Sequence, residues 1–146
     1  MHLTVLIDTL IRLGVALAVG GAVGIERELH GRGAGFRTHM LVSLGAATFA
    51  VIGQGVAVGS HAEVTRVVQG IAAGIGFLGA GTILKLSDDM EVKGLTTAAS
   101  IWLSAALGTA AGLRMYELTL AGAVIALLVL AFLRPVDKWF GRREGS

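Results

Sequence analysis

The sequence predicts an all-α membrane protein, a bundle of five transmembrane helices. Of its 146 residues, 54% are hydrophobic and only 15% are charged, and the mean hydropathy is +0.77. Soluble domains have roughly 45–50% apolar and about 25% charged residues. The charged residues fall in clusters and leave long runs that are continuously apolar, a pattern that disfavours a β-barrel. The expected spans are residues 3–24, 38–58, 66–84, 95–113 and 116–134.

The first span follows from a short uncharged run. Only 13 residues separate Arg12 from Glu26, so the helix must begin near Leu3 and carry Asp8 and Arg12 inside it. These two side chains are four residues apart and can pair on one helix face. An arginine near the end of a span can also extend its side chain to the interface.

The other four spans come from uncharged runs of 25, 18, 20 and 16 residues. A spanning helix needs roughly 20 mostly apolar residues, with a range of about 17–25. The shortest of the four runs, between Glu117 and Arg134, qualifies when the residues just before it lie in the interface.

Basic residues in the loops predict the orientation and the domain organisation. Nine lysines and arginines fall on one side of the predicted membrane and three on the other. The positive-inside rule therefore places the C-terminus in the cytoplasm and the N-terminus outside. Residues 1–134 form the membrane domain, and residues 135–146 form a short basic cytoplasmic tail whose Lys138, Trp139 and Phe140 suit the headgroup layer. The nine are Arg27, Arg32, Arg37, Lys85, Lys93, Arg134, Lys138, Arg142 and Arg143, and the three are Arg12, Arg66 and Arg114.

Composition and motif searches exclude several function classes. The absence of cysteine removes disulfide scaffolds, cysteine-based metal sites and thiol catalysis. A net charge of +2, scattered among apolar runs, does not form a nucleic-acid patch. No serine lies in a nucleophile context and the four histidines lack ligand spacing, so we expect no enzyme.

Glycine accounts for 22 residues and often recurs four positions apart. In a bilayer such GxxxG pairs let helix backbones approach closely, so we expect tight packing within or between subunits. The five pairs are Gly20/Gly24, Gly31/Gly35, Gly55/Gly59, Gly70/Gly74 and Gly108/Gly112.

The third span has the densest glycines, at Gly70, Gly74, Gly76, Gly79 and Gly81. Each weakens a helix by up to about 1 kcal/mol relative to alanine. Two interpretations stay open: neighbouring helices pack very closely here, or the helix is broken between Gly79 and Thr82 and lines a cavity or an ion site. The GxGxxG match within this segment is not a dinucleotide site, because it lies inside an uncharged run and has no acidic residue about 20 positions on.

A group of charged residues predicts an ionic cluster at the cytoplasmic face. Glu26 and Glu28 close the first span, where the partial negative charge of a helix C-terminus disfavours carboxylates. The nearest cations are Arg27, Arg37 and Lys93. The cluster is either a solvated interfacial group or a fixed ionic site.

Several polar residues fall within or beside the spans. Thr38 is an expected N-cap, and Thr96 or Thr97 is expected either as a cap or as an interhelical hydrogen-bonding group. Gln69 and Ser100 are further polar groups in the membrane. Helix N-termini attract anions, so these ends could also hold a carboxylate or an external anion.

Magnesium is the one cofactor that the residues bring into question. Asp88, Asp89 and Glu91 lie together in the loop between the third and fourth spans, and such an oxygen-rich loop can hold Mg²⁺ weakly. The competing interpretation is a solvated acidic loop. We predict no other cofactor.

Four motifs, in order, resemble the MgtC/SapB family of bacterial membrane proteins. They are GIERE at residues 24–28, AGFRTH at 34–39, GxGFLGAGTI at 74–83 and VKGLTTAASIW at 92–102. The resemblance covers roughly residues 10–134 and implies a multi-pass, five-helix module of the bacterial inner membrane. Many members continue into a soluble cytoplasmic domain after the fifth helix, and this sequence resembles the short form without it.

The family resemblance also implies a function. It suggests a role in growth under low magnesium, in survival of some pathogens inside macrophages, or, for one branch, in inhibition of the membrane ATP synthase. We expect a regulatory protein that acts through helix–helix contacts, as a homodimer in the bilayer or with another membrane protein. The alternative is a transporter or channel for Mg²⁺, another cation or a small solute, working as a dimer.

Overall fold

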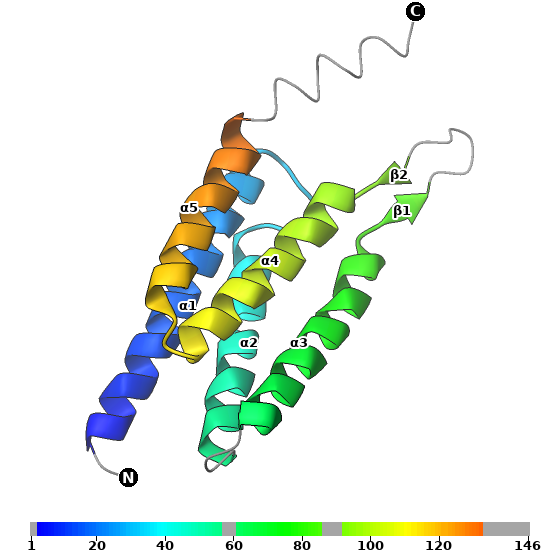
Figure 1. The fold of residues 1–146 in the computed structure, drawn as a ribbon. Helices are drawn as coiled ribbons and strands as arrows, with labels where there is room; N and C mark the ends of the chain where they lie inside the picture. The colour runs from blue at the N-terminus through cyan, green and yellow to red at the C-terminus, as the bar shows by residue number, and fades with distance from the viewer. Residues whose placement is uncertain (1–2, 57–60, 86–91, 133–146) are drawn as a thin grey trace, which may run out of the picture.

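The computed structural model describes residues 3–56, 61–85 and 92–132, and within them the chain forms five helices and one two-stranded ladder (Figure 1). The all-helical bundle is therefore confirmed, and the antiparallel ladder, which pairs Leu84 with Lys93 and Lys85 with Val92, was not predicted. The elements are α1 (Leu3–Leu29), α2 (Phe36–Val56), α3 (His61–Gly81), β1 (Leu84–Lys85), β2 (Val92–Lys93), α4 (Leu95–Gly112) and α5 (Tyr116–Phe132).

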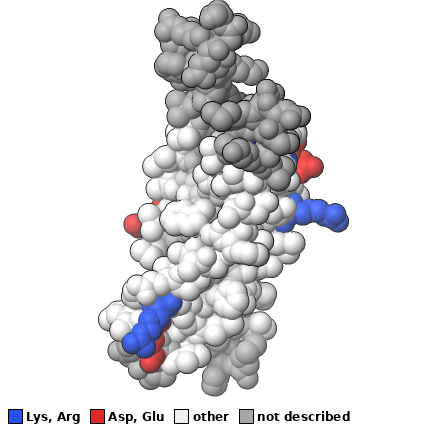
Figure 2. Space-filling view, turned by 90° about the vertical axis from the view of Figure 1, so that its right-hand side faces the viewer, with Lys and Arg blue, Asp and Glu red and all other residues white. Residues whose placement is uncertain are grey.

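Three of these helices, α1, α2 and α3, are long and apolar enough to cross a membrane, and α5 is a shorter apolar helix of 17 residues. Large apolar side chains cover the outside of the bundle, as Phe77 shows at 84% exposed. Figure 2 shows a face on which uncharged side chains cover the middle, with one group of basic and acidic side chains near the lower end and others at the edges higher up. Such a surface is suited to lipid rather than to water.

Two of the predicted helices, the first and the third, differ most from the observed ones in their bounds. Helix α1 continues to Leu29 instead of residue 24, and α3 runs from His61 to Gly81 instead of from 66 to 84. Runs of uncharged residues locate the part of a helix that lies in lipid, but charged residues do not end a helix. At the end of α1 the chain turns through Gly31, whose φ is 61°, and the N–H groups of Gly31 and Arg32 bond the carbonyls of Glu28 and Arg27. Glycine is the usual residue in this helix-ending turn.

Helices α1 and α2 approach each other most closely at two glycines of α1. A methyl group on Gly20 would lie 2.6 Å from the carbonyl oxygen of His39, and one on Gly24 would lie 2.7 Å from Cα of Phe36. Real Cβ atoms do not tolerate such distances to backbone atoms. The pair Gly20/Gly24 therefore stands where the two backbones meet.

Helix α4 packs on the other side of α2 in the same way. A methyl group on Gly108 would overlap the carbonyl oxygen of Ser43, and one on Gly112 would lie 2.6 Å from that of Ala47. Eleven of the 18 residues of α4 are buried, which makes it the central helix of the bundle. Helix α5 packs against α1 and α4 through a core of Val19, Val23, Leu107 and Ala123.

Helix α3 lies at the edge of the bundle, and Gly79 is its one buried residue among those the structure describes. A methyl group on Gly79 would lie 3.7 Å from Ala98 of α4, in ordinary contact. At Gly70, Gly74, Gly76 and Gly81, no atom of the described chain lies within 4 Å of such a group. Within the described chain, the expected close packing on this segment is therefore limited to ordinary contact at Gly79, and the other four glycines border open space.

The alternative expectation was a break between Gly79 and Thr82, and α3 is continuous up to Gly81 and ends within that stretch. The N–H and the hydroxyl of Thr82 both donate to the carbonyl of Gly79, at 3.0 and 2.8 Å. The chain then enters β1 and returns through β2 to α4.

The predicted threonine caps are wrong. Helix α2 begins at Phe36, two residues before Thr38, and the carboxylate of Glu28 accepts the hydrogen bond of the Phe36 N–H at 3.1 Å. The N-cap of α4 is Gly94, with a φ of 97° and no side-chain cap, so Thr96 and Thr97 lie in the first turn. A methyl group on Gly94 would overlap the carbonyl oxygen of Thr82, so the turn requires glycine for both reasons.

Candidate functional site

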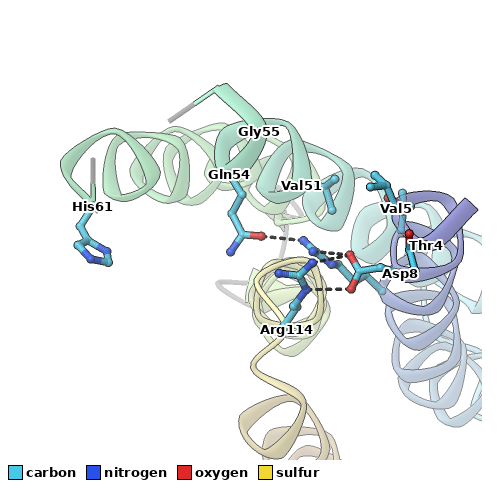
Figure 3. Close-up of a pocket in the computed structure, with 10 residues that line it drawn as sticks. Thr4, Val5, Asp8, Val51, Gln54, Gly55, His61 and Arg114 are labelled. Atoms are coloured by element: carbon cyan, nitrogen blue, oxygen red, sulfur yellow. Dashed lines mark hydrogen bonds and ion pairs between the residues drawn. The ribbon is translucent and has the colours of Figure 1, made fainter. Parts of the chain in front are cut away.

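The structure gathers polar side chains into two clusters at opposite ends of the bundle, each built around a buried arginine, Arg27 in one and Arg12 in the other. The Arg27 cluster consists of Arg27, Thr97, Ser100 and His39 and joins α1, α4 and α2. The Asp8 cluster consists of Asp8, Arg12, Gln54 and Arg114 and lies at the other end of the same helices (Figure 3).

In the Arg27 cluster, a charged side chain is held deep between helices. Arg27 is 3% exposed and donates from Nη2 to the hydroxyl of Thr97 at 3.0 Å. Thr97 thus serves as an interhelical hydrogen-bonding group, the second of the two roles predicted for it. Burying a charge requires such partners, because desolvation of an unpaired guanidinium is expensive.

The hydrogen bonds continue from Thr97 to His39. Ser100 donates its hydroxyl to the carbonyl of Thr97 at 2.8 Å and lies 3.1 Å from Nε2 of His39. His39 is fully buried, and its Nδ1 lies 2.9 Å from the carbonyl oxygen of Gly35. A carbonyl can only accept, so Nδ1 of His39 carries a proton. Sequence reasoning missed this histidine, although its place at the start of a 25-residue uncharged run was a signal.

The structure places the members of the predicted ionic cluster in different environments. The side chain of Glu26 is 10% exposed, and its carboxylate lies 3.1 Å from Nδ1 of His30, the residue that follows the end of α1. Glu28 caps α2, as described above. Arg37 is exposed and has no hydrogen bond or ion pair within the part of the chain that the structure describes, and Lys93 is exposed at the end of β2. Arg27 is the member of the group that lies in the core.

At the other end of the bundle, the predicted pairing of Asp8 with Arg12 is confirmed. Arg12 is 5% exposed and donates from Nη1 to the amide oxygen of Gln54 at 2.7 Å and to the carbonyl of Gly112 at 3.0 Å. Arg114 binds the same Asp8 carboxylate with two parallel hydrogen bonds, of 2.9 and 2.8 Å (Figure 3). One carboxylate thus holds two guanidinium groups, and the cluster joins α1, α2 and the end of α4.

Arg114 occupies an unusual backbone conformation. Its φ is 63°, and among the described residues it is the one non-glycine residue with positive φ. The turn after α4 repeats the one after α1: the N–H of Arg114 bonds the carbonyl of Ala111, and the N–H of Met115 bonds that of Ala110. Gly31 holds the equivalent position after α1. An arginine in this conformation costs roughly 1–2 kcal/mol, so its side-chain contacts must offset that cost.

The charge state of Arg114 is secure. Its hydrogen bonds to Asp8 raise the pKa of the guanidinium above its usual value. Arginine is in any case protonated throughout the physiological range. Arg114 therefore carries a full positive charge beside Asp8.

A hollow of about 800 Å³ opens beside the Asp8 cluster. Its described lining includes all four members of the cluster together with Thr4, Thr9 and His61 (Figure 3). Sequence reasoning missed Gln54 and treated Arg114 only as a loop charge. The polar residue in the second span was a signal for Gln54, but nothing local indicated that Arg114 would reach Asp8.

The remaining predicted site residues lie apart from both clusters. Gln69 and Thr96 are exposed, as is Thr38 at the start of α2, and Thr82 ends α3. Asp88, Asp89, Glu91 and the basic tail lie outside the described residues. Within residues 3–56, 61–85 and 92–132 there is no group of three or more His, Cys, Asp or Glu side chains that could hold a metal ion.

These features define a class, a helical membrane protein with a polar cluster around a buried arginine near each end of its bundle. The MgtC family profile matches residues 13–139, and the chain belongs to the MgtC family. The family assignment predicted from the four motifs is therefore confirmed.

The relatives come from different bacteria. YhiD of Escherichia coli K12, whose name proposes magnesium transport, is 42% identical over 129 residues, which are 84% of this chain and 59% of the relative. SrpB of Synechococcus elongatus is 45% identical over 87% of this chain and 75% of its own length. MgtC of Brucella abortus is 43% identical over 85% of this chain and 50% of its own length.

The chain thus spans between half and three-fifths of YhiD and the Brucella MgtC. No solved structure matches.

Proposed function

We propose that this MgtC family protein is a non-enzymatic regulatory protein of the bacterial inner membrane. Its N-terminus faces outward and its C-terminus faces the cytoplasm. It acts through contacts of α3 with a second copy or with another membrane protein, and its role is tied to magnesium limitation or membrane energetics. The names of YhiD and MgtC among its relatives support the link to magnesium.

The observation that carries the proposal is the exposed glycine pair Gly70/Gly74 of α3, which borders an apolar hollow. At Gly70 and Gly74, one turn apart on the same side of α3, a methyl group would meet nothing of the described chain within 4 Å. Each glycine nevertheless weakens the helix by about 1 kcal/mol relative to alanine. Gly20 of α1 and Gly108 of α4 offset that cost within the subunit, because each lets its helix approach the backbone of α2 closely. A partner helix that packs closely against α3 would offset the cost of its glycines in the same way.

An apolar hollow beside this face supports the same interpretation. It has a volume of about 670 Å³ and lies between α2, α3 and α4. Gly45, Gly70 and Gly74 line it together with large apolar side chains such as Phe49 and Leu78. Small residues beside large ones form a surface into which side chains of a second helix can fit.

Dense packing between the two polar clusters argues against an ion path through one subunit. Ala16, Ala47 and Ala111 pack together there and are fully buried. Gly108 leaves no room for even a methyl group next to the carbonyl of Ser43. An ion could not cross this layer without separating the helices.

Cross-linking tests the proposed contact. The chain has no cysteine, so a single Gly74→Cys change introduces the one thiol. We expect oxidation in native membranes to give a disulfide-linked dimer, or a product of higher mass with a partner protein. Gly14→Cys is the matched control, because Gly14 is exposed on α1 and also has nothing within 4 Å of an added methyl group. Equal products from both variants would mean random collision and would contradict the proposal.

Growth tests the link to magnesium. A strain that lacks its own MgtC family protein should grow in low magnesium when it carries the wild-type chain. The double change Gly70→Leu and Gly74→Leu should abolish this rescue, whereas Gly14→Leu should leave it intact. If the double variant and Gly14→Leu both lose the rescue, the α3 face has no special role.

A transporter that works as a dimer is the second candidate. The observation that favours it is the pair of polar clusters at the two ends of the bundle, which could serve as entry and exit sites beside a subunit interface. Flux of Mg²⁺, K⁺ or H⁺ into proteoliposomes above that into empty liposomes would favour it. If protein that forms the Gly74→Cys cross-link shows no such flux, the transporter function is excluded.

A further inference from the structure

We infer that the hollow beside the Asp8 cluster is a phosphate-binding site, filled by the phosphate of a lipid headgroup or by free phosphate. This inference goes beyond the proposed regulatory role and does not depend on it.

The first argument is charge. The described lining of the hollow carries two guanidinium groups, those of Arg12 and Arg114, and one carboxylate, that of Asp8. Asp8 contacts both arginines, so it cannot neutralise both of them. Arg12 is 5% exposed, and a positive charge taken out of water lacks the solvent that would otherwise stabilise it. An anion in the hollow would balance the remaining charge.

The second argument is the supply of hydrogen-bond donors. Arg114 donates to Asp8 from Nε and Nη2, so the N–H groups of Nη1 remain available to a ligand. The amide oxygen of Gln54 accepts from Arg12, so the amide nitrogen is turned away from that bond, as Figure 3 shows. His61 and Thr4 add polar groups to the same lining. Guanidinium and amide groups that converge on one space suit the oxygens of a phosphate.

The third argument is position. The residues around the hollow come from helix ends: Thr4 is in the first turn of α1, Gly55 in the last turn of α2, and His61 is the first residue of α3. Arg114 lies between α4 and α5. Lipid headgroups lie where spanning helices end, so a lipid phosphate is available there at high local concentration.

The same arrangement disfavours a cation. A site for Mg²⁺ needs carboxylates and other oxygen ligands, and here one carboxylate is already shared by two arginines. The strained backbone of Arg114, where glycine would fit more easily, is consistent with a requirement for positive charge at this position.

Lipid retention tests the inference. The purified full-length chain is placed in bilayers of phosphatidylcholine containing a small fraction of phosphatidylglycerol, and the lipids that stay bound are counted by native mass spectrometry. We expect preferential retention of phosphatidylglycerol by the wild-type protein. Arg114→Gln should weaken this retention roughly fivefold, the factor that corresponds to about 1 kcal/mol for one basic group. Arg66→Gln is the matched control, since Arg66 is exposed on the first turns of α3 outside the lining, and it should retain lipid like the wild type.

Two further variants separate ligand binding from folding. Arg114→Lys keeps the charge but loses the paired hydrogen bonds to Asp8, so it should lose stability and keep lipid retention. Gln54→Glu keeps an oxygen to accept from Arg12 but cancels the excess charge of the lining. It should keep stability and lose retention.

Inorganic phosphate identifies the source of the ligand. If the wild-type protein is stabilised thermally by millimolar phosphate and shows no preference for phosphatidylglycerol, the site takes free phosphate. If phosphatidylglycerol is retained and phosphate has no effect, the ligand is a lipid headgroup. Wild-type protein that responds to neither ligand would overturn the inference. It would be overturned equally if Gln54→Glu and Arg114→Gln bind like the wild type, or if Arg66→Gln weakens binding as much as Arg114→Gln.

Discussion

At the scale of single residues, neighbours in the sequence have opposite environments. Thr96 and Thr97 are adjacent, and both were expected near the start of a helix. Thr96 is exposed, whereas Thr97 is 7% exposed and accepts the hydrogen bond of buried Arg27. The difference follows from the direction in which each side chain leaves α4, and that direction is defined only once α1 is in place.

The threonine pair gives the first prediction. Thr97→Val removes the acceptor of a buried charged donor, and we expect it to destabilise the protein by about 1–3 kcal/mol. Thr96→Val should change stability by no more than about 0.5 kcal/mol, as exposed substitutions usually do. Thermal unfolding in mild detergent measures both, and equal effects would contradict the role assigned to Thr97.

Gly108 gives a second prediction at this scale. Gly108→Ala places a methyl group against the carbonyl of Ser43 and should destabilise the bundle by about 1–3 kcal/mol or more, through forced separation of α2 and α4. Gly14→Ala meets open space and should be neutral or should stabilise α1 by up to about 1 kcal/mol, because alanine favours helix. The order of the two melting temperatures tests the packing directly.

At the scale of helices, α1, α2 and α4 form the core and α3 stays at its edge. Glycine pairs occur on both kinds of helix, so spacing alone does not reveal which pairs are used inside the subunit. Gly94 connects the two parts, because the chain reverses there from β2 into α4 beside the end of α3.

The Gly94 turn gives a third prediction. Gly94→Ala combines a φ of 97° with overlap of the Thr82 carbonyl, so it should loosen the joint between α3 and α4. We expect faster hydrogen exchange of amides in the first turns of α4, with the last turns of α4 unaffected. Gly81→Ala has no such conflict and serves as the control. Unchanged exchange in Gly94→Ala would contradict the requirement for glycine.

At the scale of the whole molecule, the two polar clusters mark the two ends of the bundle, and the orientation remains a prediction from loop charges. The chain has no cysteine, so single cysteines report sidedness cleanly. Arg66→Cys should react with a membrane-impermeant maleimide on intact cells stripped of their outer membrane. Arg32→Cys, at the other end, should react only after permeabilisation. The reverse pattern would contradict the proposed orientation.

The family motifs, the helical class and the places of the five helices follow from the sequence by itself. Long apolar runs must be helical in lipid, since only a helix satisfies its own backbone there, and this requirement is local. The pairing of Asp8 with Arg12 is local in the same sense, because both lie on one helix face.

Only the tertiary structure decided which side chains meet across helices. Arg114 reaches Asp8 over 106 positions, and Arg27 reaches Thr97 over 70. Arg37, which charge alone grouped with Glu26, is exposed. Such partners depend on the rotation and packing of whole helices, which are set by backbone approaches at Gly20 and Gly108 and not by any local pattern.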